Sequence, residues 1–229
     1  MAMAQTWLLL NHGPLPPAEN MAWDEALLES APRLGRPLLR FYGWAEPAAT
    51  FGYFQKFAEV ERLTPLRPLI RRPTGGGLVP HYADWTYSIV VPPDEHWYSL
   101  KAATSYRRVH EWIRAAFAGL SLTTQLSSSS RAGTPGQCFI GAEQFDVLLG
   151  ERKIAGAAQR RTRAGLLIQG SIQPPAGADR RGFEAAMLAV GSRDWQLEWM
   201  EAAVDESLDC RVGELARERY SRDEFNRRR

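Results

Sequence analysis

The sequence predicts an α+β fold in which mixed and antiparallel sheets are flanked by helices. Strand-like and helix-like segments do not alternate regularly along the chain, and three strand-like segments past its middle follow one another through short turns. With 229 residues, 45% of them hydrophobic, and 8 tryptophans, the chain can bury a core of its own. These observations disfavour both disorder and a doubly wound parallel sheet.

The first half of the chain is expected to mix short strands with helices. A strand over 6–11 precedes a helix over 21–31, which should begin after Asn20 as its N-cap and end at Pro32. Residues 99–118 carry apolar side chains on one stripe and form the clearest helix. The other elements expected here are strands over 38–44, 48–53, 69–72 and 84–91 and a helix over 57–63.

The second half is expected to begin with strands and to end in helices. The expected elements, in order, are a strand over 121–126, a polar loop over 127–136 and antiparallel strands over 145–149, 153–161 and 166–173. After Pro174-Pro175 the pattern is helical to the last residue, with breaks near Gly191 and Cys210.

Composition and charge exclude several classes of protein. The formal net charge is +2, and no basic run alternates with aromatic residues as a nucleic-acid groove would require. No segment approaches membrane-spanning length, and the start of the chain lacks the features of a signal peptide. Cys138 and Cys210 do not make a disulfide framework, so we expect a cytoplasmic protein. His12, His96 and His110 have no partners at metal-binding spacing, and we expect no metal site.

The segment Arg-Arg-Pro-Thr-Gly-Gly-Gly over 71–77 is the first candidate site. Its glycines let the backbone adopt positive φ and let a ligand lie directly on the amides, and paired guanidinium groups suit a carboxylate or a phosphate. No Lys-Ser/Thr follows the glycines, as a P-loop would need. By itself the segment fits a flexible hairpin loop equally well. The candidate binding residues are Arg71, Arg72, Thr74, Gly75, Gly76 and Gly77.

Lys153 is the second candidate, and it is one of only 3 lysines in the chain. Arginine does not replace the compact ammonium group of lysine. A lysine in an arginine-rich chain therefore raises the question whether its position needs an amine. The small residues that follow, including Gly156 and Ala157, leave a channel where an elongated apolar ligand could approach the sheet. The alternative is an exposed lysine at the start of a strand. Because an amine at a strand edge contributes little packing, we expect Lys153→Ala to leave the fold intact.

Cys138 and His81 complete the set of candidates. A cysteine is usually a small buried apolar side chain, but a nearby cation makes it a thiolate nucleophile. Lys153 could supply that charge if the two residues meet across the sheet. His81 follows the glycine segment and could face the same pocket as a ligand contact or an acid/base, and a packing role fits it equally well. We expect residues 71–77, Cys138 and Lys153 to line one pocket.

Together these segments resemble the catalytic domain of the biotin/lipoate protein ligase superfamily, in the branch of lipoate–protein ligases and octanoyltransferases. The resemblance implies an acyl chain in a tunnel against the glycine segment, with Lys153 at its carbonyl or carboxylate end. It covers about residues 7–190, so we expect a catalytic domain over 1–190 and a helical C-terminal extension over 191–229. The motifs that carry it, in the family's order, lie at 20–26, 41–44, 51–53, 71–77, 86–88, 153–161 and 169–172.

The resemblance implies either of two reactions, of which we favour the first. Cys138, followed by Phe139, falls where cysteine-dependent octanoyltransferases carry their nucleophile. It would take an octanoyl group from octanoyl-acyl carrier protein and pass it to a lysine of a lipoyl-domain protein, either the glycine cleavage H protein or a 2-oxoacid dehydrogenase E2. Lys153 would offset the oxyanion charge, and no cofactor would be bound permanently.

The alternative is an ATP-dependent ligase that forms lipoyl-adenylate with ATP and Mg. Gly77 stands where cysteine-dependent transferases usually carry Arg, and two residues separate His81 from Asp84 where ligases tend to have none, so the motifs depart from both patterns. The residues after Gln173 are too few for the additional C-terminal domain of many ligases, which favours the transferase.

Overall fold

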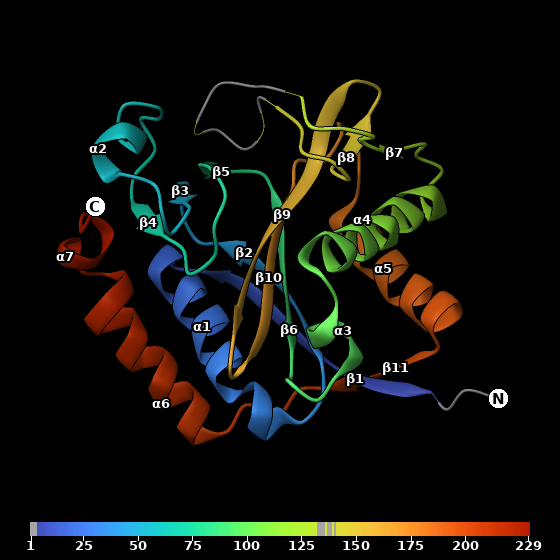
Figure 1. Cartoon of the computed structure of the whole chain (residues 1–229), viewed down its shortest axis with the longest axis horizontal. Coiled ribbons are helices and arrows are strands. Elements are labelled where there is room, and N and C mark those ends of the chain that lie inside the picture. Colours follow the sequence, from blue (N-terminus) through green and yellow to red (C-terminus); the bar gives the residue numbers. More distant parts are fainter. Residues whose placement is uncertain (1–3, 132–135, 137–138, 140) are drawn as a thin grey trace.

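The computed structural model describes residues 4–131, 136, 139 and 141–229. They form an eight-stranded sheet with the order β11-β1-β2-β6-β10-β9-β8-β7 and a three-stranded sheet with the order β4-β3-β5 (Figure 1). Strand β1 pairs in parallel with β2 and β11, whereas β2, β6, β10, β9, β8 and β7 pair in antiparallel fashion. The predicted α+β class with mixed and antiparallel sheets is therefore confirmed.

The strands and helices have the following bounds. The large sheet consists of β1 (Gln5–Leu15), β2 (Leu38–Trp44), β6 (Trp85–Val91), β7 (Gln125–Leu126), β8 (Val147–Leu149), β9 (Arg152–Thr162), β10 (Gly165–Ile172) and β11 (Leu197–Glu201). The small sheet consists of β3 (Ala48–Phe51), β4 (Leu69–Arg71) and β5 (Val79–His81). The helices are α1 (Pro17–Leu34), α2 (Phe57–Val60), α3 (His96–Ser99), α4 (Ala102–Gly119), α5 (Arg180–Trp195), α6 (Glu206–Leu215), the π-helix η1 (Ala216–Tyr220) and α7 (Asp223–Asn226).

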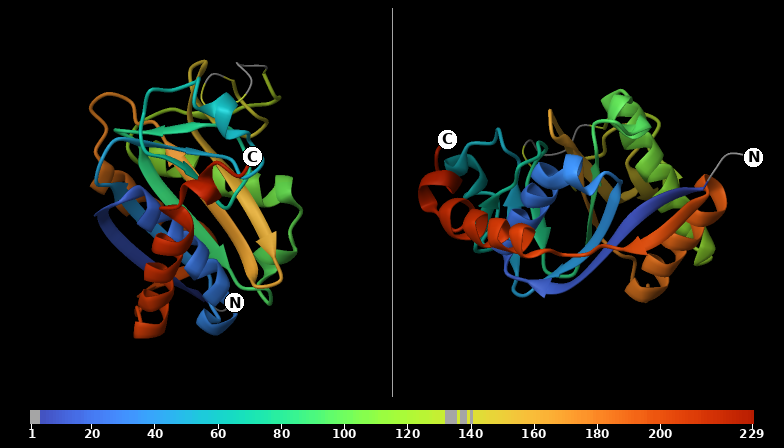
Figure 2. Two further views of the ribbon diagram at one scale, coloured as in Figure 1. Left: turned by 90° about the vertical axis from the view of Figure 1, so that its left-hand side faces the viewer. Right: turned by 90° about the horizontal axis from the view of Figure 1, so that it is seen from below.

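Helices cover both faces of the large sheet (Figures 1 and 2), and its strands β2, β6 and β10 are almost wholly buried. Helices α1 and α6 pack on one face and helices α4 and α5 on the other. Successive side chains of a strand point to opposite faces. Accordingly Trp7 joins the core under α4 and α5, while its neighbour Leu8 joins the core under α1. Ile89 and Val90 of the central strand β6 divide in the same way.

Helix α1 differs from its expected bounds at both ends. It begins at Pro17, because proline at the first helical position lacks only an N–H that would have no partner inside the helix. It also continues past Pro32, which lies in its last turn. Asn20 is not the cap. Its buried side-chain amide instead donates to the carbonyls of Leu15 and Gly43 and ties the helix to the ends of two strands.

The segment over 191–229 is not wholly helical as expected. Its boundary falls inside α5, and residues Leu197–Glu201 form β11, an edge strand parallel to β1. Leu197 and Trp199 alternate with polar residues, and Leu197 lies in the core with Trp199 packed against it. This five-residue alternation is too short to stand out beside the helices around it.

Two other expectations were wrong in detail. The helix expected over 99–118 is α4, which begins three residues later at Ala102, and the short helix α3 before it had not been expected. The strand expected over 121–126 is only Gln125–Leu126. Strand β5 had not been expected, because it is short and contains Pro80, which is disfavoured in strands.

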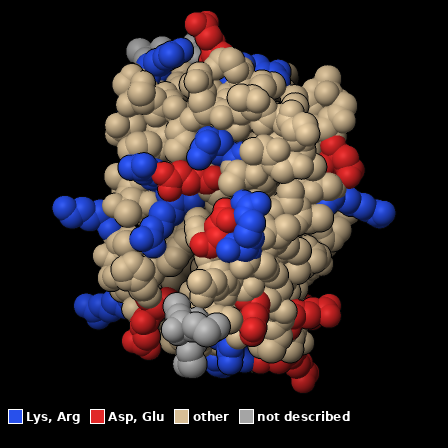
Figure 3. Space-filling model, turned by 90° about the vertical axis from the view of Figure 1, so that its right-hand side faces the viewer, with Lys and Arg blue, Asp and Glu red and all other residues tan. Residues whose placement is uncertain are grey.

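Charges of both signs are present on one face of the molecule, and the helices of the described part of the chain include no candidate membrane span. Among its helices none is long and apolar enough to cross a bilayer. Figure 3 shows the right-hand side of Figure 1, and on this face Lys and Arg are interspersed with Asp and Glu.

Gly170 is required by the close approach of β10 to β6, and this can be tested. Gly170 pairs directly with Tyr87, and an added Cβ would lie 2.1 Å from the Tyr87 ring. We expect Gly170→Ala to lower the free energy of unfolding by at least about 1–3 kcal/mol and the melting temperature by about 2–4 °C per kcal/mol. Gly13→Ala in β1 is the matched control, since no atom lies within 4 Å of its added Cβ. Equal melting temperatures for the two variants would contradict the prediction.

Candidate functional site

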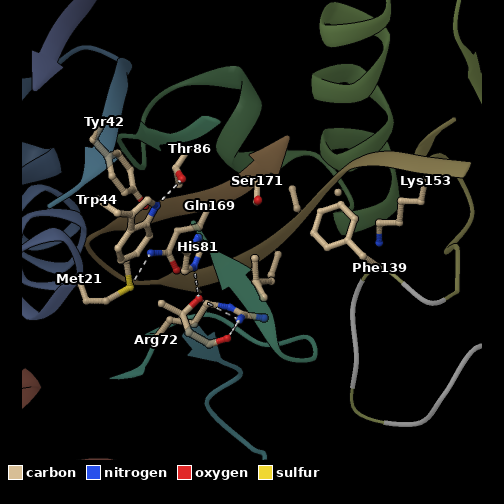
Figure 4. Close-up of a pocket in the computed structure, with 16 residues that line it drawn as sticks. Met21, Tyr42, Trp44, Arg72, His81, Thr86, Phe139, Lys153, Gln169 and Ser171 are labelled. Atoms are coloured by element: carbon tan, nitrogen blue, oxygen red, sulfur yellow. Dashed lines mark hydrogen bonds between the residues drawn. The ribbon is translucent and has the colours of Figure 1, made fainter. Parts of the chain in front are cut away.

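A pocket lies between the two sheets, with β9 and β10 along one side (Figure 4). Its empty volume is about 460 Å³, counted out to its open mouth. Side chains from α1, β2, β3, β5, β6, β9 and β10 line it. Lys153 and Phe139 lie at one end, and Trp44 and His81 lie toward the other (Figure 4).

The structure brings some of the expected site residues together and leaves others out. Those that line the pocket are Arg72, His81, Lys153, Gly156 and Ala157. Thr74 and the three glycines do not line it, although Thr74 donates to Gln169 and the Gly75 carbonyl accepts from Arg72, both of which do. Cys138 lies outside the described residues, whereas Phe139, the next residue in sequence, lines the pocket.

Lys153 is buried, not exposed at a strand edge. Its side chain is 7% exposed, and Nζ lies 2.7 Å from Oδ2 of the fully buried Asp146. The same oxygen accepts a hydrogen bond of 2.6 Å from the amide of Glu143, and Oδ1 accepts one from the hydroxyl of Tyr106. The expectation that Lys153 can be replaced without effect on the fold is therefore wrong, because its removal would leave a buried carboxylate without its cation.

The backbone around Lys153 explains its orientation. The register of β9 against β8 shifts so that Leu148 pairs with Lys153 but Val147 pairs with Ala155. Such a bulge changes the direction in which a side chain points. The Lys153 side chain then folds over Gly156, where a Cβ would lie 2.7 Å from Nζ. The small residue at this position is thus needed for the lysine to reach Asp146.

His81 forms part of the wall at the opposite end. Its Nδ1 lies 2.8 Å from Oδ2 of Asp84, and its Nε2 lies 2.8 Å from Oγ1 of Thr50. The Trp44 ring stacks on the imidazole with centroids 3.8 Å apart. Because both ring nitrogens have partners, this arrangement fits a packing and ligand-contact role better than acid/base chemistry.

The two arginines of the glycine segment face opposite ways, since neighbouring strand residues do so. Arg72 turns toward the pocket, and its guanidinium donates to the carbonyls of Thr50 and Gly75. Arg71 turns away and donates to the carbonyls of Tyr53 and Asn226. Burial, and then the charges of two C-terminal arginines, lower the pKa of Arg71 to about 10. The expectation that Arg71 binds substrate is therefore wrong in this structure.

A buried carboxylate beneath the pocket was not identified from the sequence. Asp24 of α1 accepts hydrogen bonds of 2.8 Å from Arg40, 2.9 Å from Tyr42, 2.7 Å from Ser88 and 2.6 Å from Gln169. Gln169 in turn accepts from Thr74, so the network reaches the glycine segment.

Asp146 and Tyr106 were also missed, although weak signals existed. Asp146 interrupts an apolar strand-like run, and Tyr106 lies one helical turn before His110 on the stripe of α4 that faces the core. Neither signal says that the two side chains meet, because 40 residues separate them. Among the described residues no three His, Cys, Asp or Glu side chains group as metal ligands.

Comparison with known proteins gives matches over most of the chain. The sequence profile of the lipoyl protein ligase A/B catalytic domain matches residues 16–176. Octanoyltransferase LipM of Symbiobacterium thermophilum is 37% identical over 183 residues, which cover 74% of this chain and 66% of that protein. Octanoyltransferase LipM of Moorella thermoacetica is 35% identical over 178 residues, which cover 74% and 65%. The chain spans about two thirds of the length of these curated relatives.

Solved structures share the fold. Protein Ta0514 from T. acidophilum with bound lipoic acid superposes with a TM-score of 0.80 at 22% identity, over 99% of this chain and 100% of that one. Lipoate-protein ligase A bound with ATP superposes with a TM-score of 0.76 at 22% identity, over 98% and 99%. At this level of identity the likeness concerns the fold, and it confirms the expected ligase-like architecture.

The buried ion pair predicts a stability effect. Lys153→Ala leaves Asp146 charged and buried, and loss of one partner of such a pair costs about 3–5 kcal/mol. We expect a lower urea midpoint for Lys153→Ala and a partial recovery in the double variant Lys153→Met/Asp146→Asn, which buries no unpaired charge. A Lys153→Ala protein as stable as the wild type would show that the pair is not buried as described.

The buried imidazole of His110 predicts a pH dependence. Burial first, and then the charge of Lys153, lower the pKa of His110 from 6.5 to about 3. Between these values the unfolded chain binds a proton that the folded chain does not, so stability falls as the pH drops, by up to about 1.4 kcal/mol per pH unit. His110→Gln should flatten this loss in urea unfolding between about pH 4.5 and 7.5. His96→Gln, at an exposed position, is the control, and parallel slopes for both variants would contradict the prediction.

Proposed function

Because this chain belongs to the lipoyl protein ligase A/B catalytic domain family, we propose that it transfers an octanoyl or lipoyl group to a lysine of a lipoyl-domain carrier protein. The observation that carries the proposal is the buried Lys153 ammonium at one end of a pocket whose side is built from small residues. A cation at the end of such a channel suits an acyl chain whose carbonyl must be polarised.

The shape and lining of the pocket suit a medium-length acyl chain. The empty space of the pocket, about 460 Å³ with the solvent at its mouth included, extends between Lys153 at one end and His81 toward the other. Met21, Val79 and the run from Gly156 to Ala158 supply apolar surface. Lys153 and His81 stand toward the two ends of the pocket, and the polar side chain of Ser171 lies between them.

The transfer we propose proceeds in two steps through Cys138. The thiolate attacks the thioester carbonyl of octanoyl-acyl carrier protein, and the carrier thiolate leaves and takes up a proton. The amine of the lipoyl-domain lysine then attacks the acyl-enzyme thioester, forms an amide and expels the Cys138 thiolate. The proton that the amine loses is taken up by this thiolate. Lys153 donates to the oxyanion in both steps. The support for Cys138 is that its neighbour Phe139 lines the pocket with its ring 5.2 Å from Nζ of Lys153.

The similar octanoyltransferases favour octanoyl as the acyl group, and octanoyl-acyl carrier protein is the donor that we propose. The acceptor would be the glycine cleavage H protein or a 2-oxoacid dehydrogenase E2, and the reaction would take place in the cytoplasm without a permanently bound cofactor.

An ATP-dependent ligase is the second candidate. The unbroken triplet of Gly75, Gly76 and Gly77 favours it, as does the likeness of this fold to proteins with bound lipoic acid and with bound ATP. ATP with Mg and free lipoate would then give lipoyl-adenylate, which the acceptor lysine attacks directly.

One variant assayed with two donors decides between these reactions. We expect wild-type protein to gain the mass of one octanoyl group from octanoyl-acyl carrier protein and Cys138→Ser to lose turnover, since an alkoxide forms far less readily than a thiolate near neutral pH. Intact-protein mass spectrometry of enzyme and acceptor is the readout, with Cys210→Ser at an exposed position as the control. Lipoylation that needs ATP and survives in Cys138→Ser, with no transfer from the carrier thioester, would establish the ligase instead.

A further inference from the structure

We propose that Asp146 and Tyr106 are positioning residues that hold the Lys153 ammonium at the reacting carbonyl. This inference rests on the proposed acyl transfer. It adds two residues to that reaction, neither of which is expected to touch the acyl group. The three side chains come from separate elements, namely α4, the turn before β8, and β9.

The donors around Asp146 are enough to keep a carboxylate charged in the interior. The residue is fully buried, and its two oxygens receive three donors: Nζ of Lys153 at 2.7 Å, the amide of Glu143 at 2.6 Å, and the hydroxyl of Tyr106. A buried charge persists only when it is paired and its remaining lone pairs are satisfied. The carboxylate is therefore a fixed anchor for the ammonium.

Tyr106 connects this anchor to the wall of the pocket. Its oxygen lies 3.4 Å from the amide nitrogen of Ala157, a pocket residue, while its proton points to Asp146. Burial, and then the negative charge of Asp146, raise the pKa of the Tyr106 phenol well above its usual range. The phenol thus remains a donor to Asp146 across the working pH range of an enzyme.

The position of Asp146 beside Lys153 leaves N–H groups of the ammonium available to a substrate. An ammonium has three N–H donors. Among the described residues Lys153 forms an ion pair with Asp146 and lies 5.2 Å from the centre of the Phe139 ring. A donor that does not face Asp146 can point to a carbonyl oxygen on which negative charge develops.

The lysine content of the chain permits a test that does not depend on activity. Of the 3 lysines, Lys56 and Lys101 are exposed. In protein labelled with ¹⁵N-lysine, we expect one ammonium signal that exchanges slowly with water and is absent from Lys153→Arg. It should also be lost in Asp146→Asn, while the methyl spectrum remains that of a folded protein. A signal that persists unchanged in Asp146→Asn would overturn the proposed anchor.

Kinetics test the consequence for transfer. Asp146→Asn should lower kcat for octanoyl transfer by about 10- to 100-fold with KM for the octanoyl donor changed less than about threefold, because the positioned cation matters most at the transition state. Tyr106→Phe keeps the ion pair and should give a smaller loss of kcat, about three- to tenfold. Tyr98→Phe is the matched control, since it also removes one hydroxyl hydrogen bond, to the carbonyl of Thr162, and should leave kcat unchanged.

The outcomes separate this inference from the proposed function. A wild-type protein that transfers no octanoyl group refutes the function, and the ammonium signal still reports whether Asp146 holds Lys153. An active wild type whose Asp146→Asn and Tyr106→Phe variants both keep kcat within about twofold refutes the positioning role. If Asp146→Asn does not fold, Tyr106→Phe against Tyr98→Phe decides, and equal kcat for that pair overturns the proposal.

Discussion

The ion pair between Asp24 and Arg40 is the interaction on which the pocket depends. Both side chains are fully buried, and a charged pair without solvent is tolerable only when its other hydrogen-bonding capacity is satisfied. Tyr42, Ser88 and Gln169 meet that requirement from three different strands. Because the donors must converge on one carboxylate, helix α1 is held in one position over β2, β6 and β10.

Two further buried carboxylates extend this frame to the ends of the pocket. Oδ2 of Asp84 accepts a hydrogen bond of 2.7 Å from the hydroxyl of Ser171 in the large sheet. The same oxygen lies 2.8 Å from Nδ1 of His81 in the small sheet, so Asp84 joins the two sheets. Asp146 joins α4 to β9, because it accepts a hydrogen bond from Tyr106 of α4 and forms an ion pair with Lys153 of β9. Between these polar junctions the strands carry small residues. The pocket is therefore a channel with small residues along one side, held in a rigid polar frame. Such preorganised donors are what stabilise developing charge in a transition state.

Long, strongly patterned elements were predictable from the sequence, and short ones were not. Helix α4 carries an apolar stripe over many residues, and strands β6, β9 and β10 are 7, 11 and 8 residues long. Local sequence is enough to predict elements of this length. Strands β5 and β11 have three and five residues and owe their existence to neighbours that are distant in sequence. Their pairing with β3 and β1 supplies the hydrogen bonds that define them as strands.

By itself the sequence determined the fold class, the glycine segment after β4, and Lys153 at the head of a small-residue strand, because residue type and local spacing carry that information. Only the tertiary structure decided that Arg72 faces the pocket while Arg71 faces the C-terminal segment, since the pleat and register of β4 set each direction. It also decided that the partners of Lys153 are Asp146 and Tyr106. A one-residue shift of register between β8 and β9 turns the ammonium toward them, and such a shift follows from pairing between strands.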